Sequence, residues 1–97
     1  MSLTTELDKA MKFARLVNNY IPLLDNSAFS FSQNSSWPEK YKMQMVGREL
    51  EKHRNKVNKL IVEIDKKYSF VPSALTMRRQ LKNGLDRLEN FALPYVN

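Results

Sequence analysis

A seven-residue hydrophobic repeat in the middle of the chain constrains the fold more than any other feature. Between Trp37 and Tyr68, side chains of mostly apolar character recur in steps of three and four. This spacing places them along one side of an α-helix and excludes the two-residue alternation of a strand. We call this row the seam; its residues are Met43, Val46, Leu50, His53, Val57, Leu60 and Ile64. The pattern predicts a helix over about residues 37–68, roughly 45 Å long at 1.5 Å per residue.

The ends of this predicted helix carry signals of their own. Ser36 followed by Glu39 matches a capping box, and Pro38 is tolerated in a first helical turn. Beyond Tyr68, Pro72 prevents the helix from continuing, because proline lacks the amide hydrogen that a helix interior needs. The sequence therefore predicts a helix of about 30 residues with defined ends.

A first helix is predicted before it. Apolar residues with the same three-four spacing run from Leu3 to Leu24. Pro22 disfavours helical geometry at the preceding residue, so the helix is expected over about residues 3–21, or to residue 24 with a kink.

A last helix is predicted over about residues 73–92, with Ser73 as its N-cap. The Asn83–Gly84 pair is a turn and helix-end signal, so a break at 83–84 is the alternative. The hydrophobic period continues through the pair, which favours one unbroken helix. Because the connection before it is short, we expect it to be antiparallel to the helix that precedes it.

These elements predict an all-α fold, a three-helix antiparallel (up-down-up) bundle with a long central helix and coiled-coil-like packing. A chain of 97 residues is expected to form a single domain spanning residues 1–97.

Residues 25–36 differ in composition from the rest of the chain. They contain five serines and several amides, whose side chains compete with the backbone for hydrogen bonds, so we predict a loop. Three aromatic residues lie in or beside this segment: Phe29, Phe31 and Trp37. In an extended segment Phe29 and Phe31 point the same way. They are interpreted either as a plug for one end of the bundle or as an exposed recognition surface that binds another protein.

The residue types needed for catalysis are sparse. The chain has no cysteine and one histidine, His53, which lies on the seam. Without neighbouring ligands at metal-binding spacing, and without a glycine-rich phosphate loop, we predict no metal, no cofactor and no enzymatic activity. His53 is interpreted either as a structural residue of the seam, satisfied by a hydrogen bond, or as a pH-sensitive switch.

Positive charge is concentrated on the central helix. The chain has a net charge of +6, and between residues 40 and 67 nine basic residues stand against four acidic ones. Four of these cations fall within an arc of about 80° on the helix, opposite the seam. They are Arg48, Lys52, Lys56 and Lys59. Such a stripe is either simply solvated or binds an anionic partner.

The last helix adds a smaller group of cations. Arg79 and Lys82 are expected to point outward from a helix that follows a turn, as in a helix-turn-helix recognition helix. The long preceding helix is unlike that motif, so the match is weak. These residues join the central stripe as the alternative, nucleic-acid-binding surface.

Taken with its composition, the sequence predicts a non-catalytic macromolecule-binding module. The favoured partner is another protein with an acidic surface, in a regulatory or adaptor role. Nucleic acid and a second copy of the chain, as a homodimer, are the alternatives. No apolar run is long enough to span a membrane, and the first residues lack the order of a signal peptide, so a cytoplasmic protein is expected.

Overall fold

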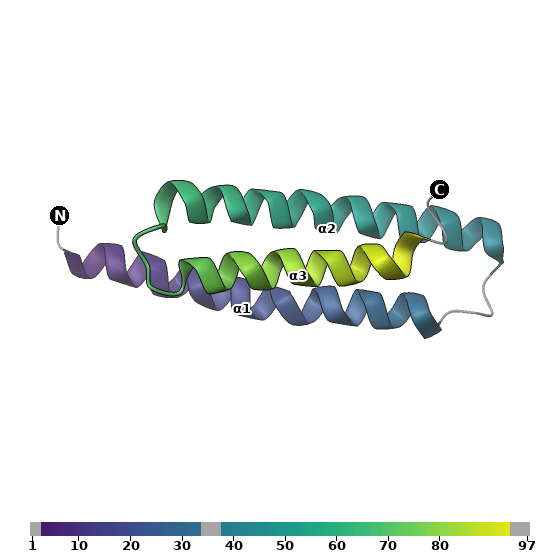
Figure 1. Ribbon diagram of the computed structural model, residues 1–97, viewed down its shortest axis with the longest axis horizontal. Coiled ribbons are helices and arrows are strands. Elements are labelled where there is room, and N and C mark those ends of the chain that lie inside the picture. Colours follow the sequence, from purple (N-terminus) through teal and green to yellow (C-terminus); the bar gives the residue numbers. More distant parts are fainter. Residues whose placement is uncertain (1–2, 34–37, 94–97) are drawn as a thin grey trace.

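The structure, a computed structural model, describes residues 3–33 and 38–93. It contains three helices, α1 (Leu3–Gln33), α2 (Glu39–Lys67) and α3 (Ala74–Ala92), and no strand in the described residues. α1 and α3 run in the same direction and α2 runs opposite to both (Figure 1). The predicted three-helix antiparallel bundle is confirmed. It is elongated, with extents of 55 × 19 × 18 Å.

The predicted central helix is present with nearly the expected bounds. Its seam is buried from Val46 to Ile64, as a helix that packs against two neighbours requires. Met43, by contrast, is 47% exposed, so the buried seam starts one step later than predicted. Pro38 occupies the N-cap position without a side-chain cap, and the predicted capping residue Ser36 lies outside the described residues.

The prediction for the first helix was wrong. α1 continues through Pro22 to Gln33, so most of the segment predicted as a serine-rich loop, residues 25–36, is helical. α1 is therefore the longest helix, with 31 residues against 29 in α2. The prediction relied on local preferences, which are weak and are overridden by tertiary contacts.

Contacts to both other helices hold this extension of α1 in place. Leu24 is fully buried. Asp25 accepts hydrogen bonds from the Arg87 guanidinium of α3, the shorter at 2.9 Å. The Ser27 hydroxyl lies 3.0 Å from Nε2 of His53 in α2. These long-range contacts compensate for the low helix propensity of the segment and for the hydrogen bond that Pro22 removes.

The last helix is unbroken, as its hydrophobic period predicted. Asn83 and Gly84 lie inside α3. Gly84 is buried, and a Cβ at this position would lie 2.8 Å from Cδ1 of Leu24. The glycine therefore serves the close approach of α1 and α3 and does not end a helix.

The three helices are unequally spaced. α1 packs most extensively against α3 and least against α2. Small residues, among them Gly84 and Ala28, are buried in the core and allow helices to approach closely. At the C-terminal end of α2, two aromatic rings lie between α1 and α2: Phe13 stacks on Tyr68 with ring centroids 4.4 Å apart. The result is a bundle that is tight along α3 and more open between α1 and α2.

None of the described helices combines the length and apolarity needed to cross a lipid bilayer.

Candidate binding groove between α1 and α2

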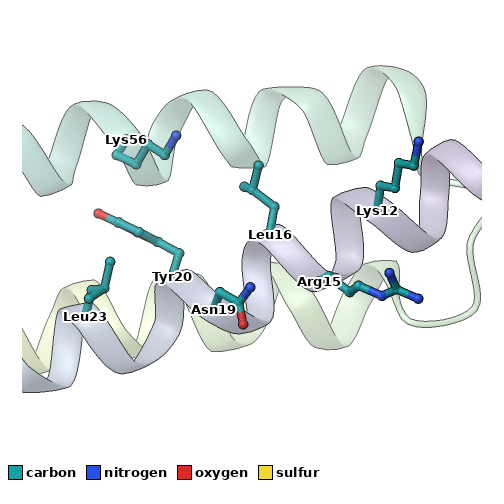
Figure 2. A pocket seen from close by; sticks show the side chains of 7 residues that line it. All are labelled: Lys12, Arg15, Leu16, Asn19, Tyr20, Leu23 and Lys56. Carbon is teal, nitrogen blue, oxygen red and sulfur yellow. The ribbon is translucent and has the colours of Figure 1, made fainter.

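A groove runs along the part of the bundle where α1 and α2 face each other. Two adjoining hollows form it, with volumes of about 430 Å³ and about 530 Å³. They share Tyr20, Leu23 and Lys56, and no residue of α3 lines either of them. Figure 2 shows the first of the two hollows. We call this feature the α1–α2 groove; it extends along residues 12–23 of α1 and 52–59 of α2.

The middle of the groove is apolar. Leu16 and Tyr20 point from α1 toward α2 (Figure 2). Leu16 and Leu23 are 45% and 52% exposed, whereas Tyr20 is buried. We call these three residues the floor. Water in contact with the two leucines would be released on binding, so the floor favours an occupant that brings apolar groups of its own.

The edges of the groove are positively charged on both sides. No carboxylate is among the residues that line it. Within the described part of the chain, none of its cations forms an ion pair. We call these five cations the rim: Lys12 and Arg15 from α1, and Lys52, Lys56 and Lys59 from α2. Lys52, Lys56 and Lys59 lie three or four residues apart on α2, where like charges repel, and an anionic occupant would relieve that repulsion.

Three cations outside the groove, Arg54, Arg78 and Arg87, pair with carboxylates of neighbouring helices. Arg54 of α2 donates to Glu89 of α3 at 2.9 Å, and Arg87 of α3 donates to Asp25 of α1 at 2.9 Å. The rim differs from these interface cations, because none of its five members is paired with a carboxylate of the described residues.

A buried polar cluster supports the groove from inside. The Tyr20 hydroxyl lies 2.6 Å from Nδ1 of His53, and Nε2 of the same ring faces both Ser27 Oγ at 3.0 Å and Glu49 Oε2 at 3.4 Å. Among the described residues, no buried side-chain nitrogen or oxygen lacks a partner. The cluster links α1 to α2 through hydrogen bonds that satisfy the polar groups buried between the two helices.

The hydrogen bonds of this cluster define the state of the ring. Burial, with a smaller contribution from the Glu49 charge, raises the pKa of Tyr20 to about 12, so its hydroxyl stays protonated and donates to Nδ1. Burial also lowers the pKa of His53 below its usual 6.5, against the opposing effect of Glu49. The ring is thus neutral at pH 7 and carries its proton on Nε2, beside an acceptor-only carboxylate.

This tautomer has a chemical consequence. With its proton on Nε2, the ring faces the Ser27 hydroxyl as a donor, whereas a histidine that activates a serine must accept the hydroxyl proton. The hydrogen bonds of the ring to Tyr20 and Ser27 order the base of the groove. In the part of the chain that the structure describes, no three acidic, histidine or cysteine side chains gather in a way that could hold a metal ion.

The predicted basic residues separate into three places. Lys52, Lys56 and Lys59 line the α1–α2 groove. Arg48 is exposed on α2 but does not line the groove. Arg79 and Lys82 lie on α3, where they line a separate hollow of about 350 Å³. The two groups proposed together from the sequence therefore belong to different surfaces.

The predicted aromatic surface changes with the helical extension of α1. Phe29 is on α1 and 64% exposed. The backbone of Phe31 also belongs to α1, so positions 29 and 31 are about 200° apart around the helix axis and the segment is not extended. The side chain of Phe31 and the whole of Trp37 lie outside the described residues. The premise of an extended aromatic loop is thus wrong, and its role in binding stays a prediction.

The sequence prediction missed the α1 half of the groove. Lys12 and Arg15 were not singled out, because their partners in the rim are about 40 residues away along the chain. One signal was present: Leu16, Tyr20 and Leu23 repeat with steps of four and three beside the buried row of α1. A second apolar row on a helix indicates a second packing partner.

No model of a protein family matches the chain, and comparisons with curated proteins and with solved structures give no significant match. What the groove is able to bind therefore follows from its own shape and charge.

Proposed function

We propose that the chain is a non-catalytic protein-binding module, with a regulatory or adaptor role, that captures an acidic partner in the α1–α2 groove. One observation carries the proposal. Five cations on two helices border an apolar floor, and no carboxylate lies among the lining residues. This combination of a charged rim and an apolar centre is the anatomy of a protein-binding surface. The rim steers the partner and the floor holds it.

A nucleic-acid ligand is the second candidate, favoured by the positive charge on both sides of the groove. Phosphates would pair with the rim, and binding would weaken steeply as salt is raised. The exposed leucines of the floor count against this candidate, because a duplex backbone gives them no apolar partner.

Site-specific photo-crosslinking in cells of the organism that produces the protein tests the proposal. A benzophenone amino acid replaces Leu16 or Leu23 in the groove and, as a control, Leu75, which is 75% exposed on α3. We expect protein crosslinks from the two groove positions and none from the control position. They should disappear when Lys52, Lys56 and Lys59 are changed together to Glu.

Three results would count against the proposal. Equal crosslinking from position 75 would show a surface without specificity. Crosslinks that survive the triple charge reversal would show that the rim has no part in capture. Crosslinked products that return to the size of the free chain after nuclease treatment would favour the nucleic-acid candidate.

A further inference from the structure

We infer that the occupant of the α1–α2 groove is a single acidic amphipathic helix, which docks along α1 and α2 and completes a four-helix arrangement. The inference rests on the proposed function and adds the shape and pattern of the partner. Three features of the groove lead to it: the placement of α3, the spacing of the floor residues, and the position of the rim.

The first feature is the placement of α3. α1 and α2 each pack more extensively on α3 than on each other. In a four-helix bundle, two helices on opposite corners have this relation, and two further helices fill the spaces on either side of them. Here α3 fills one space. The groove, which no α3 residue lines, has the place of the other.

The second feature is the spacing of the floor. Leu16, Tyr20 and Leu23 follow one another in steps of four and three. A helix that receives another helix presents its side chains with this period, since each knob enters a hole made by four residues of its neighbour. An extended peptide would instead need pockets for alternate side chains. From residue 12 to residue 23 the groove is roughly 16 Å long, enough for about three helical turns.

The third feature is the position of the rim. Lys52, Lys56 and Lys59 also follow one another in steps of four and three on α2, and Lys12 and Arg15 line the groove from α1. Cations that flank an apolar row at these steps select a partner helix with acidic residues on both sides of its own apolar row. The occupant is therefore expected to alternate leucine-like residues with Glu or Asp along one face.

The same charges argue against a second copy of the chain as the occupant. Each copy carries a net charge of +6, so two copies would bring like charges together. A different chain, acidic along one helix, matches the rim.

Synthetic peptides test the inference on the full chain. The probe is a peptide of about 21 residues, three heptads of Leu and Glu with apolar residues in steps of three and four. A control peptide has the same composition in scrambled order, and a second control carries Lys in place of Glu. We expect the patterned peptide to bind at least about tenfold more tightly than the scrambled one by fluorescence anisotropy. Its circular dichroism should show a gain of helix on binding.

Matched variants of the chain locate the site. Lys52→Glu, Lys56→Glu and Lys59→Glu together should weaken binding of the patterned peptide by about tenfold or more. Arg79→Glu with Lys82→Glu, which reverses charges on α3, should leave binding within about twofold. The variants are compared only after their circular dichroism and thermal transitions match those of the original chain, so that loss of the fold is not read as loss of binding.

The possible failures are distinguishable. Equal binding of the scrambled peptide at the groove would overturn the inference that the occupant is a helix. The proposal that the groove captures an acidic protein would remain. If no peptide binds but the groove positions still crosslink to a protein partner, the helical occupant is again overturned and capture of an acidic protein remains. Absence of both would overturn both proposals. A short duplex DNA that displaces the patterned peptide and binds more tightly would replace both with the nucleic-acid candidate. Dimers that block the peptide would identify a second copy as the occupant.

Discussion

The interfaces of α3 and the α1–α2 groove are built from the same helices by opposite means. Along α3, a buried glycine allows close approach, and ion pairs cross to each neighbour, as in Arg87 with Asp25 and Arg78 with Asp65. Along the groove, the cations of the rim surround an apolar floor, and no carboxylate is among the lining residues. The difference separates residues that hold the fold together from residues available to a partner.

Adjacent leucines on α1 give the largest expected contrast. Leu24 is fully buried, and Leu23 on the groove floor is 52% exposed. Leu24→Ala should lower the free energy of unfolding by about 2–5 kcal/mol, because it leaves a cavity in the core. Leu23→Ala should change it by less than about 0.5 kcal/mol, as is usual for surface substitutions. Urea denaturation of both variants measures the contrast, and equal losses would mean that the floor is core.

The polar cluster under the groove gives the next effect. Tyr20→Phe leaves Nδ1 of His53 without its donor at 2.6 Å. An unsatisfied buried acceptor costs about 1–3 kcal/mol, which chemical denaturation at pH 7 would detect. If stability is unchanged, the hydroxyl bond does not contribute to tying α1 to α2.

The same cluster makes stability depend on pH. The pKa of His53 is lowered in the folded chain, so the unfolded chain takes up its proton first, near 6.5, as the pH falls. Stability should therefore decrease as the pH is lowered through about 6.5 and level off below the folded pKa. His53→Gln should flatten this part of the profile in denaturation curves between about pH 8 and pH 5. A profile that rises toward acid would contradict a lowered pKa.

Adding one methyl group at each of the two glycines compares an open position on α2 with the close contact between α1 and α3. A Cβ at Gly47 of α2 meets nothing within 4 Å, whereas one at Gly84 lies 2.8 Å from Leu24 Cδ1. Gly47→Ala should stabilise by up to about 1 kcal/mol through helix propensity. Gly84→Ala should be less stable than Gly47→Ala by about 1–3 kcal/mol, because Leu24 must move. Thermal melts of the two variants decide; equal gains would mean that α1 and α3 are not closely packed there.

Charge reversals should change the free energy of unfolding least, with opposite signs at the α3 interface and at the rim. Arg87→Glu breaks the pair with Asp25 at 2.9 Å and should destabilise by about 0.2–1 kcal/mol, the range for exposed pairs. Lys56→Glu places a carboxylate among the rim cations and should be neutral or stabilise by up to about 0.5 kcal/mol. Both changes should shrink in high salt, which screens surface charges. A loss for Lys56→Glu would show that the rim is not under repulsion.

The parts of the fold that the sequence predicted are those that repeat. The buried row from Val46 to Ile64 and the unbroken α3 followed from their three-four period. The extension of α1 past Pro22 did not, because the contacts that support it, such as Asp25 with Arg87, join residues 62 positions apart. Only the α2 half of the groove was predictable, since packing alone places Lys12 and Arg15 of α1 around the same hollow as Lys56 of α2.

We propose that a partner binds in the α1–α2 groove and not on the α3 surface. Nuclear magnetic resonance titration of the labelled chain with the patterned acidic peptide tests it most directly. We predict that amide shifts change along residues 12–23 of α1 and 52–59 of α2, while the exposed face of α3 around Arg79 and Lys82 stays unchanged. Shifts centred on that face of α3, or changes spread evenly over all cationic surfaces, would contradict the account.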